Sequence, residues 1–504
     1  MKAFKKYVYI GLPLAGVLFY LYYLYITTID MIYSDYIRLI NSYLPDVWNP
    51  EKFFVADLLT RIPMNYLVRG INVTFFDYSV TLERVLGVLS FGASALVVGV
   101  YCRKQRIGLG WFTALMVFMF SLNKWEMIYN STGWIHFLAF ACFFYNYMVL
   151  DRVYRNRGKK YDLAKLAALP ALITIFVAGP YCAIYSMTLL IAYGFIWIQN
   201  WHWNWCRNRD GISGRRGILA AIFGGDYCKI TDRQMIILLA SVIWPLLLYI
   251  WSDSQALYEH AGAVEGSLIG TFLEQPEFFL KFLLKSFASI VFGVELISEH
   301  MQEISDMHLY LVGAGVLGSY FLALWMNFHY GIYKKTLVPL IFLAGGGMNH
   351  LVVMVSRWIF LKDTYGMSSR YALQFQVGIL GIFLTFAFAW KKCSAGKQEA
   401  AENAAKPGIV QTQAIKSTWM DLAVRVLTLA IAAGILMGNL MTTKAELAKA
   451  PYRKVYSLEV KEILLDFENQ DDDILKQKLE YSKPGKKEAL RILRDNGLNI
   501  FKDN

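Results

Sequence analysis

Charged residues are scarce in this chain of 504 residues: they make up 17% of it, while hydrophobic residues make up 56%. A soluble domain carries about a quarter charged residues, so the composition argues against a water-soluble globule. Apolar runs near the roughly 20 residues that a helix needs to cross a bilayer recur from Tyr7 to about Leu440. The sequence therefore predicts an all-α fold, a polytopic transmembrane helical bundle.

Cysteine is also rare. The six cysteines fall in apolar spans or basic loops, apart from Cys182 near a helix mouth, so no disulfide framework is predicted in the outer loops. Walker motifs, glycine-rich phosphate loops and nucleophile elbows are missing, and the histidines show no zinc spacing. One weak possibility of a metal site remains, because the pairs Glu259-His260 and Glu299-His300 could bind one cation together. We expect no metal and no other cofactor.

Reading the apolar runs as membrane spans gives about eleven crossings. A run of bulky residues without a small-residue cleavage site makes the first span a signal-anchor rather than a cleaved signal. The spans are 7–27, 85–101, 109–122, 134–150, 166–178, 182–198, 235–251, 309–325, 337–355, 371–390 and 422–440. Gly179-Pro180 can instead break one long hairpin between the fifth and sixth of them.

Basic loops between the spans indicate the orientation. They are Arg103–Arg106, Arg152–Lys160, Arg207–Arg216, Lys334-Lys335 and Lys391-Lys392. All fall on one side if the amino terminus is inside, and the positive-inside rule places that side in the cytoplasm. The formal charge of +12 is thereby explained as a topology signal, and nucleic-acid binding is not expected.

One segment conflicts with this scheme. Phe278 to Val294 is apolar enough to cross but carries Lys281 and Lys285, and a crossing there would reverse every later helix. We interpret it as a re-entrant or interfacial helix. The alternative is a twelfth crossing that leaves the carboxyl-terminal tail inside.

The predicted organisation is a transmembrane bundle over residues 1–440, with outer loops at 28–84 and 252–308. A cytoplasmic linker is expected over 391–419, and a polar tail over 441–504, outside the membrane, with a helix around Lys487 to Arg494. The tail is too small to hold a core of its own.

The first outer loop opens with Asp30, Asp35 and Arg38. If the segment is helical, Asp35 and Arg38 share a face. A carboxylate at the membrane surface near a cation suits a general base that deprotonates a sugar hydroxyl, so Asp35 or Asp30 is the candidate. The alternative is an ordinary helix start with a solvated ion pair.

Arg61 and Arg69 follow in the same loop beside apolar residues. Guanidinium groups grip phosphate with two hydrogen bonds, so both are candidates for binding a donor phosphate. Contact with anionic lipid headgroups is an equally simple interpretation.

Two turns put polar clusters at helix mouths on the outer side. Polar groups at membrane depth usually line a cavity. Glu126 can form an ion pair with Arg370, or Arg370 and Arg357 can hold a leaving phosphate. Trp125 and Tyr371 can also be members of the aromatic belt that anchors helices at the membrane interface. The candidate residues here are Asn123, Trp125, Glu126, Arg357, Arg370 and Tyr371.

Taken together, these features resemble the bacterial polytopic membrane proteins related to C-type glycosyltransferases (GT-C) of surface-polysaccharide pathways. The resemblance spans most of the chain through short motifs. They are the acidic start around Asp35, Arg61-Ile62-Pro63, Phe120–Glu126, Ser369-Arg370-Tyr371 and the tail Leu493–Phe501. Relatives tend to have His before the arginine of the second motif, where this chain has Thr60.

The resemblance implies an inverting glycosyltransferase in the bacterial inner membrane. Its partners would be membrane lipid, a polyprenyl-phosphate sugar donor and a glycan or glycolipid acceptor. An acid of the first outer loop would be the base, and basic residues at the membrane surface would hold the lipid phosphate.

Other functions remain open at this point. The main alternative is a transporter or flippase of lipid-linked saccharides, although no internal symmetry favours it. A polysaccharide polymerase is a second alternative. An acyl-modifying enzyme is a third, and it would use an intramembrane histidine such as His136 or His350.

Overall fold

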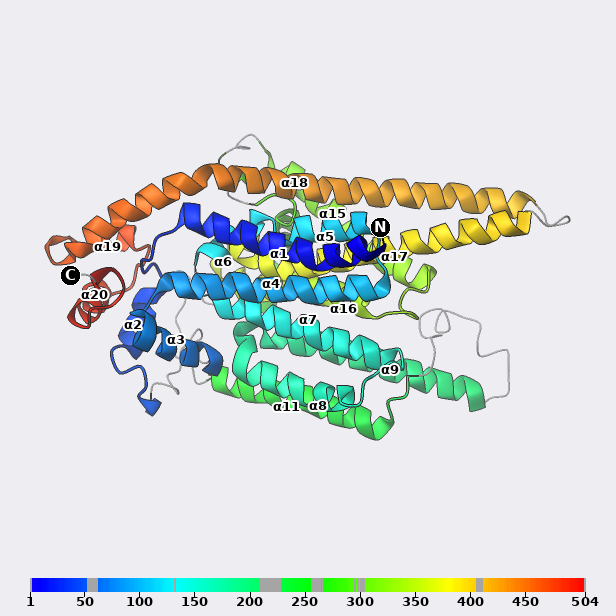
Figure 1. Cartoon of the computed structure of the whole chain (residues 1–504), viewed down its shortest axis with the longest axis horizontal. Coiled ribbons are helices and arrows are strands. Elements are labelled where there is room, and N and C mark those ends of the chain that lie inside the picture. The colour runs from blue at the N-terminus through cyan, green and yellow to red at the C-terminus, as the bar shows by residue number, and fades with distance from the viewer. Residues whose placement is uncertain are drawn as a thin grey trace.

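The computed structural model describes residues 2–51, 62–130, 133–208, 228–254, 264, 266–293, 296–297, 299, 304–404 and 411–502. Within these ranges the secondary structure is helical and contains no strand, which confirms the all-α fold class. Nine helical segments of the described residues are long and apolar enough to cross a membrane. The chain is therefore a multi-pass membrane protein whose long helices lie alongside one another in one bundle (Figure 1).

The long helices account for most of the chain. They are α1 (Lys2–Thr27), α4 (Val80–Gln105), α7 (Trp134–Tyr154), α9 (Cys182–Asn208), α11 (Asp232–Ser254), α15 (Asp306–His329), α16 (Val338–Arg357), α17 (Ala372–Ala404) and α18 (Gln411–Leu465). The shorter helices are α2 (Tyr36–Tyr43), α3 (Pro63–Phe76), α5 (Leu109–Met119), α6 (Trp125–Tyr129), α8 (Asp162–Ile173), α12 (Leu268–Glu274), α13 (Pro276–Ala288), α19 (Asp472–Lys478) and α20 (Lys486–Asp495).

Two local features explain why nine spanning segments are found where about eleven were predicted. The expected span 109–122 contains α5, whose 11 residues are shorter than a full crossing requires. The expected spans 166–178 and 182–198 belong to one helical stretch, Asp162–Trp205. Gly179 interrupts this stretch with a positive φ of 50°, a conformation that glycine adopts without steric cost.

Glycines bring neighbouring helices of the bundle into close contact. A Cβ atom on Gly346 of α16 would lie 2.2 Å from the Cα of Gly378 on α17, and one on Gly313 of α15 would lie 2.0 Å from the carbonyl oxygen of Leu284 on α13. Close backbone approach at small residues is the usual way in which membrane helices pack. The glycine clusters within these spans therefore serve packing.

The segment predicted to be re-entrant, 278–294, overlaps α13. This helix has 13 residues, which give a length of about 20 Å, against a hydrocarbon core of about 30 Å. Its Lys285 is 2% exposed and pairs with Asp306 at 3.0 Å and with Asp363 at 2.8 Å. Part of the second predicted outer loop lies outside the described residues.

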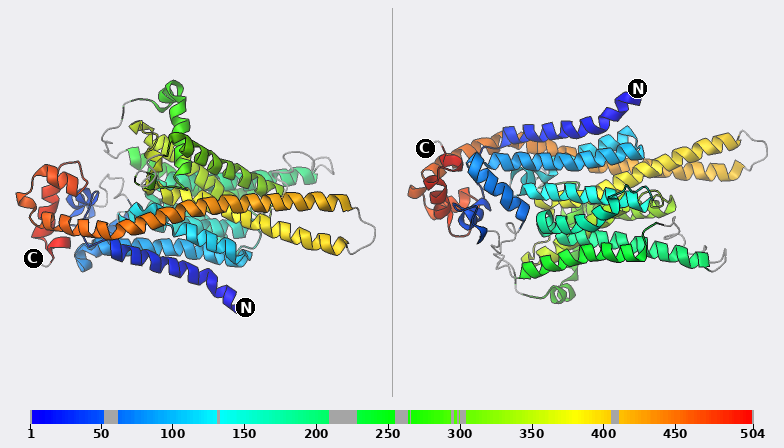
Figure 2. Two further views of the ribbon diagram at one scale, coloured as in Figure 1. Left: turned by 90° about the horizontal axis from the view of Figure 1, so that it is seen from above. Right: turned by 60° about the horizontal axis from the view of Figure 1, so that its bottom comes forward.

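One end of the bundle carries a compact cap, formed by residues 29–51, 62–79 and 466–502. Helices α2 and α3 of the first predicted outer loop gather there with α19 and α20 of the tail (Figures 1 and 2). Both parts contribute to one hydrophobic core, in which Ile37 and Ile40 lie with Leu475 and Leu490. The tail is thus packed on the first loop.

Basic segments meet at the opposite end of the bundle. Lys391 donates a hydrogen bond to the backbone oxygen of Gln105 at 3.1 Å and lies within electrostatic range of Lys335 and Arg106. Lys104 similarly lies near the basic loop that follows α7. The positive residues of separate loops therefore share one end, away from the cap.

The linker expected over 391–419 is helical in its described residues, 391–404 and 411–419. Helix α17 continues to Ala404, and α18 begins at Gln411, so the two extend beyond the other helices (Figure 1). Alanine, glutamate, lysine and glutamine are strong helix formers, and this composition sustains the helix here. For the same reason α18 continues past Met441 to Leu465.

Candidate functional site

The two acids of the first predicted outer loop have different surroundings. Oδ1 of Asp30 accepts a hydrogen bond of 3.0 Å from the backbone N–H of Thr81, in the first turn of α4, where such groups lack partners within the helix. Asp35 directly precedes α2 without capping it through its side chain. Asp35 and Arg38 are both half-buried. Asp35 is therefore the acid whose carboxylate does not cap a helix.

The two turns that were predicted to carry polar clusters at helix mouths are in contact: Ser369 and Arg370 of one turn bind Glu126 of the other. Arg370 donates a hydrogen bond through Nε to Oε1 of Glu126. The hydroxyl of Ser369 donates to the other carboxylate oxygen at 3.0 Å. Glu126 lies on α6, and the other two residues lie in the helical turn Ser369–Tyr371. One carboxylate thus joins two turns that are distant in the sequence.

Asp35 lies within electrostatic range of this ion pair. After Glu126, the charge of Asp35 and the phenol of Tyr33 are the groups that act on the Arg370 guanidinium. The ring of Tyr33 packs edge-on against Tyr129, with centroids 5.7 Å apart. We call Tyr33, Asp35, Glu126, Ser369 and Arg370 the cap-end cluster.

Asn123 and Trp125 flank the cluster and make structural contacts. Nδ2 of Asn123 donates to the backbone oxygen of Ser289 at 2.9 Å, which ties this turn to the end of α13. The Trp125 ring lies beneath the guanidinium of Arg453, whose Cζ is 3.6 Å from the ring centroid. Both residues therefore hold the turn that carries Glu126.

Arg357 and Tyr371 form a second polar group nearby. Arg357 ends α16 and is half-buried. Its charge acts on the phenols of Tyr371 and Tyr181. Because Tyr371 directly follows Arg370 in the chain, the guanidinium of Arg357 lies near the cap-end cluster.

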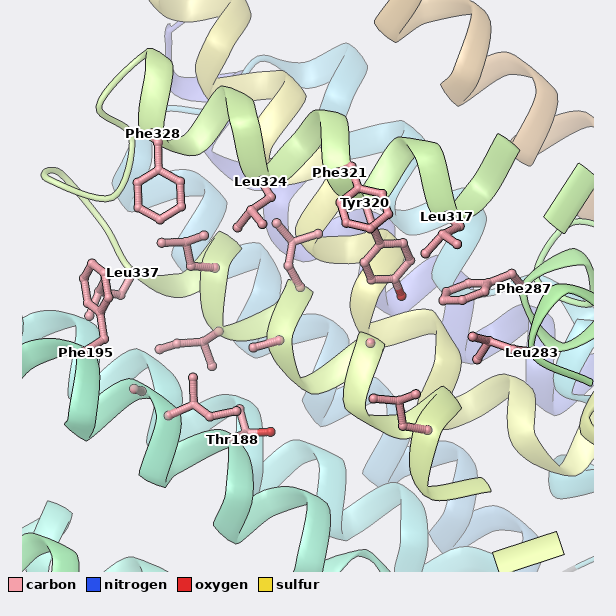
Figure 3. Close-up of a pocket in the computed structure, with 18 residues that line it drawn as sticks. Thr188, Phe195, Leu283, Phe287, Leu317, Tyr320, Phe321, Leu324, Phe328 and Leu337 are labelled. Carbon is pink, nitrogen blue, oxygen red and sulfur yellow. The ribbon is translucent and has the colours of Figure 1, made fainter. Parts of the chain in front are cut away.

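An apolar cavity of about 490 Å³ lies between α9, α13, α15 and α16. Figure 3 shows Leu283 and Phe287 at one end of it and Phe195 and Phe328 at the other. Its lining is almost wholly aliphatic and aromatic; Thr188 and Tyr320 are the lining residues that carry hydroxyl groups. Such a space suits a hydrocarbon chain.

A row of neighbouring rings connects the cavity to the polar residues. The ring of Phe287 lies 3.9 Å from that of His350, which lies 3.9 Å from Phe375. The Phe375 ring is in turn 6.1 Å from Tyr371. The end of the cavity at Phe287 therefore lies a few side chains from Arg357.

Arg69 is buried in the cap and does not lie at the membrane surface as predicted. It is 1% exposed, and its Cζ lies 5.7 Å from the Tyr43 ring centroid. It interacts electrostatically with Tyr78 and Glu83. The face of α3 that carries Arg69 therefore packs inside the cap. Arg61 lies outside the described residues.

Sequence reasoning missed Arg453 and Glu446, which lie on α18. Arg453 pairs with Glu446 at 2.6 Å and donates to the hydroxyl of Tyr23 at 2.9 Å. Glu446 is 1% exposed. Both follow Leu440, where the apolar run ends and a polar tail was expected. Their spacing of seven residues, on one helical face, was the available signal.

No metal centre is found in the described part of the chain, where no group of three His, Cys, Asp or Glu side chains is arranged to hold an ion. Glu259, His260 and His300 lie outside the described residues. Glu299 forms an ion pair of 2.7 Å with Lys449.

No protein-family model, curated protein or solved structure matches the chain.

Proposed function

We propose that the protein is an integral membrane glycosyltransferase that moves a sugar from a polyprenyl-phosphate carrier to a glycan or glycolipid. The membrane would be the bacterial inner membrane, with the cap end on the non-cytoplasmic side, because the basic segments meet at the other end. The observation that supports the proposal is the convergence of Asp35, Glu126 and Arg370 from three distant segments.

Asp35 is the proposed general base. The acceptor hydroxyl oxygen forms a bond to the anomeric carbon, the bond from that carbon to the phosphate oxygen breaks, and the hydroxyl proton passes to the Asp35 carboxylate. Polyprenyl phosphate leaves with the bonding electrons. Because it is a competent leaving group, the reaction needs no nucleotide-binding domain and no cofactor.

Arg357, Tyr371 and Arg370 are the proposed phosphate ligands. Arg370 binds Glu126 through Nε, so its terminal NH groups can face the donor. Charge-assisted hydrogen bonds from guanidinium groups to phosphate are among the strong ones. The carrier chain would lie in the apolar cavity, which a row of rings links to Tyr371.

The test is to incubate purified protein with polyprenyl-phosphate sugars and to follow the release of free polyprenyl phosphate. Asp35→Asn is expected to abolish release while donor binding is retained, because only the base is lost. Asp46→Asn is the matched control, since Asp46 is an exposed acid of the same loop.

Two outcomes would count against the proposal. Full release by Asp35→Asn and Asp30→Asn alike would remove the proposed base. Movement of a lipid-linked saccharide between leaflets without any release would favour the flippase alternative.

A further inference from the structure

The carboxyl-terminal tail contacts the cap-end cluster directly beside Asp35. The Tyr33 hydroxyl donates to the carboxylate of Glu480. The backbone N–H of Ser34 donates to the carbonyl oxygen of Leu479 at 2.9 Å, and the Ser34 hydroxyl lies 3.4 Å from the carbonyl oxygen of Glu480. Three contacts thus hold the two residues that precede Asp35.

Both sides of this contact have an unusual backbone conformation. Ser34 has a φ of 50° and Glu480 a φ of 48°, in the left-handed region, which is unfavourable for residues other than glycine. Such residues persist where the surrounding structure holds them, and they cluster at functional sites. The two left-handed residues therefore indicate a contact that is held in place from both sides.

Further hydrogen bonds attach the rest of the tail to the first predicted outer loop, so the tail can hold this contact in place. Oδ1 of Asn499 accepts from the backbone N–H of Ile32 at 3.1 Å, and its Nδ2 donates to the carbonyl oxygen of Tyr78 at 2.9 Å. The Asn41 amide donates to the carbonyl oxygen of Gly485 at 3.0 Å. These bonds, with the shared hydrophobic core, attach the tail around α2.

We infer that Glu480 is a positioning residue for Asp35: through Tyr33 and Ser34 it fixes the turn that holds the Asp35 carboxylate within electrostatic range of Arg370. The inference rests on the proposed role of Asp35 as the base. A base must lie within hydrogen-bonding reach of the acceptor hydroxyl, and a displacement of about 1 Å can cost a large factor in rate. The tail then contributes to the site by positioning Asp35, without contacting the substrate itself.

The first test measures transfer. Glu480→Ala is expected to lower kcat about tenfold with an unchanged KM for the donor, because the base is displaced and the donor site is intact. Glu480→Gln should restore kcat, since its amide oxygen still accepts from Tyr33. Tyr33→Phe should match Glu480→Ala, and the double variant should lose no more than either alone.

Glu488→Ala is the matched control, since Glu488 is an exposed glutamate of α20 in the same tail, and its kcat should equal that of the wild type. Full kcat in Glu480→Ala, a loss that appears only in KM, or additive losses in the double variant would each overturn the inference.

A second readout does not depend on catalysis. Asp35→Cys is labelled with a membrane-impermeant maleimide, with the parent protein as the background. Labelling is expected to accelerate when Glu480→Ala is added and to stay unchanged when Glu488→Ala is added. Unchanged labelling with Glu480→Ala would overturn the positioning role of Glu480. Accelerated labelling, together with an absence of transfer activity in the wild type, would contradict only the proposed function.

Discussion

Glu126 and Arg370 are separated by 244 positions in the chain, and their side chains form an ion pair at the cap end of the bundle. The Glu126 side chain is 18% exposed and that of Arg370 is 51% exposed. Water therefore screens the guanidinium more than the carboxylate. The pair joins the turn after α5 to the turn before α17, so it fixes the distance between two parts of the proposed site.

Double-mutant analysis of this pair should detect the connection. Glu126→Gln and Arg370→Gln are each expected to lower the free energy of unfolding, with a coupling energy near the exposed-pair value of about 1 kcal/mol. The measurement is denaturant unfolding of the purified protein in detergent. Additive effects would mean that the two side chains do not stabilise the turns through each other.

Much of the fold was predictable because lipid imposes a simple rule: a crossing segment must be apolar and must satisfy its own backbone. The runs that became α4, α15 and α16 obey it. The rule fails where an apolar run is barely long enough to cross, as in α5. It makes no prediction for segments beyond the membrane, where alanine and lysine continue α17 and α18 as helices.

The site was harder to predict, since contacts between distant segments leave no local signal. Glu126 and Arg370 were recognisable as polar groups at helix mouths. Arg69 has the same sequence character as a surface arginine, yet the packing of α3 buries it. Arg453 was overlooked because its helix continues after the apolar run has ended.

Asp30→Ala should separate a structural acid from the proposed base. Removing the acceptor for the Thr81 N–H leaves the first turn of α4 without this cap, which typically costs about 1 kcal/mol. We expect a lower unfolding temperature with kcat unchanged, whereas Asp35→Asn should lose kcat and keep its unfolding temperature. The reverse pattern would assign the base to Asp30.

Lys124 provides a prediction about pH. Its ammonium group is 1% exposed and donates to the backbone oxygens of Met119 at 2.7 Å and Ser121 at 3.1 Å. Burial lowers the pKa of Lys124 to about 7, whereas an unfolded lysine titrates near 10.4. Between these values the unfolded state binds more protons, so stability must rise with pH.

We expect the free energy of unfolding of the wild type to rise between about pH 7 and pH 10, by at most about 1.4 kcal/mol per pH unit from this group. Lys124→Met should remove that contribution to the slope, although it also lowers stability by losing the hydrogen bonds. Unfolding measured across this pH range in both proteins tests the difference. Parallel curves would show that Lys124 does not titrate as stated.

Gly347 offers a way to fill the apolar cavity without disturbing the bundle. It lines the cavity, and an added Cβ would meet only Cε1 of Tyr320, at 3.9 Å, an ordinary contact. Gly318 on α15 is a matched control, because an added Cβ there has no heavy atom within 4 Å and the residue does not line the cavity.

Gly347→Leu should raise KM for a long-chain polyprenyl donor. Excluding about two methylene groups of the carrier, at roughly 0.8 kcal/mol each, predicts an increase of about tenfold. A donor whose shortened chain leaves the cavity empty should keep its KM, and Gly318→Leu should behave as the wild type with both donors. Equal KM values for the long-chain donor in wild type and Gly347→Leu would place the carrier chain elsewhere on the bundle, even if sugar transfer itself is observed.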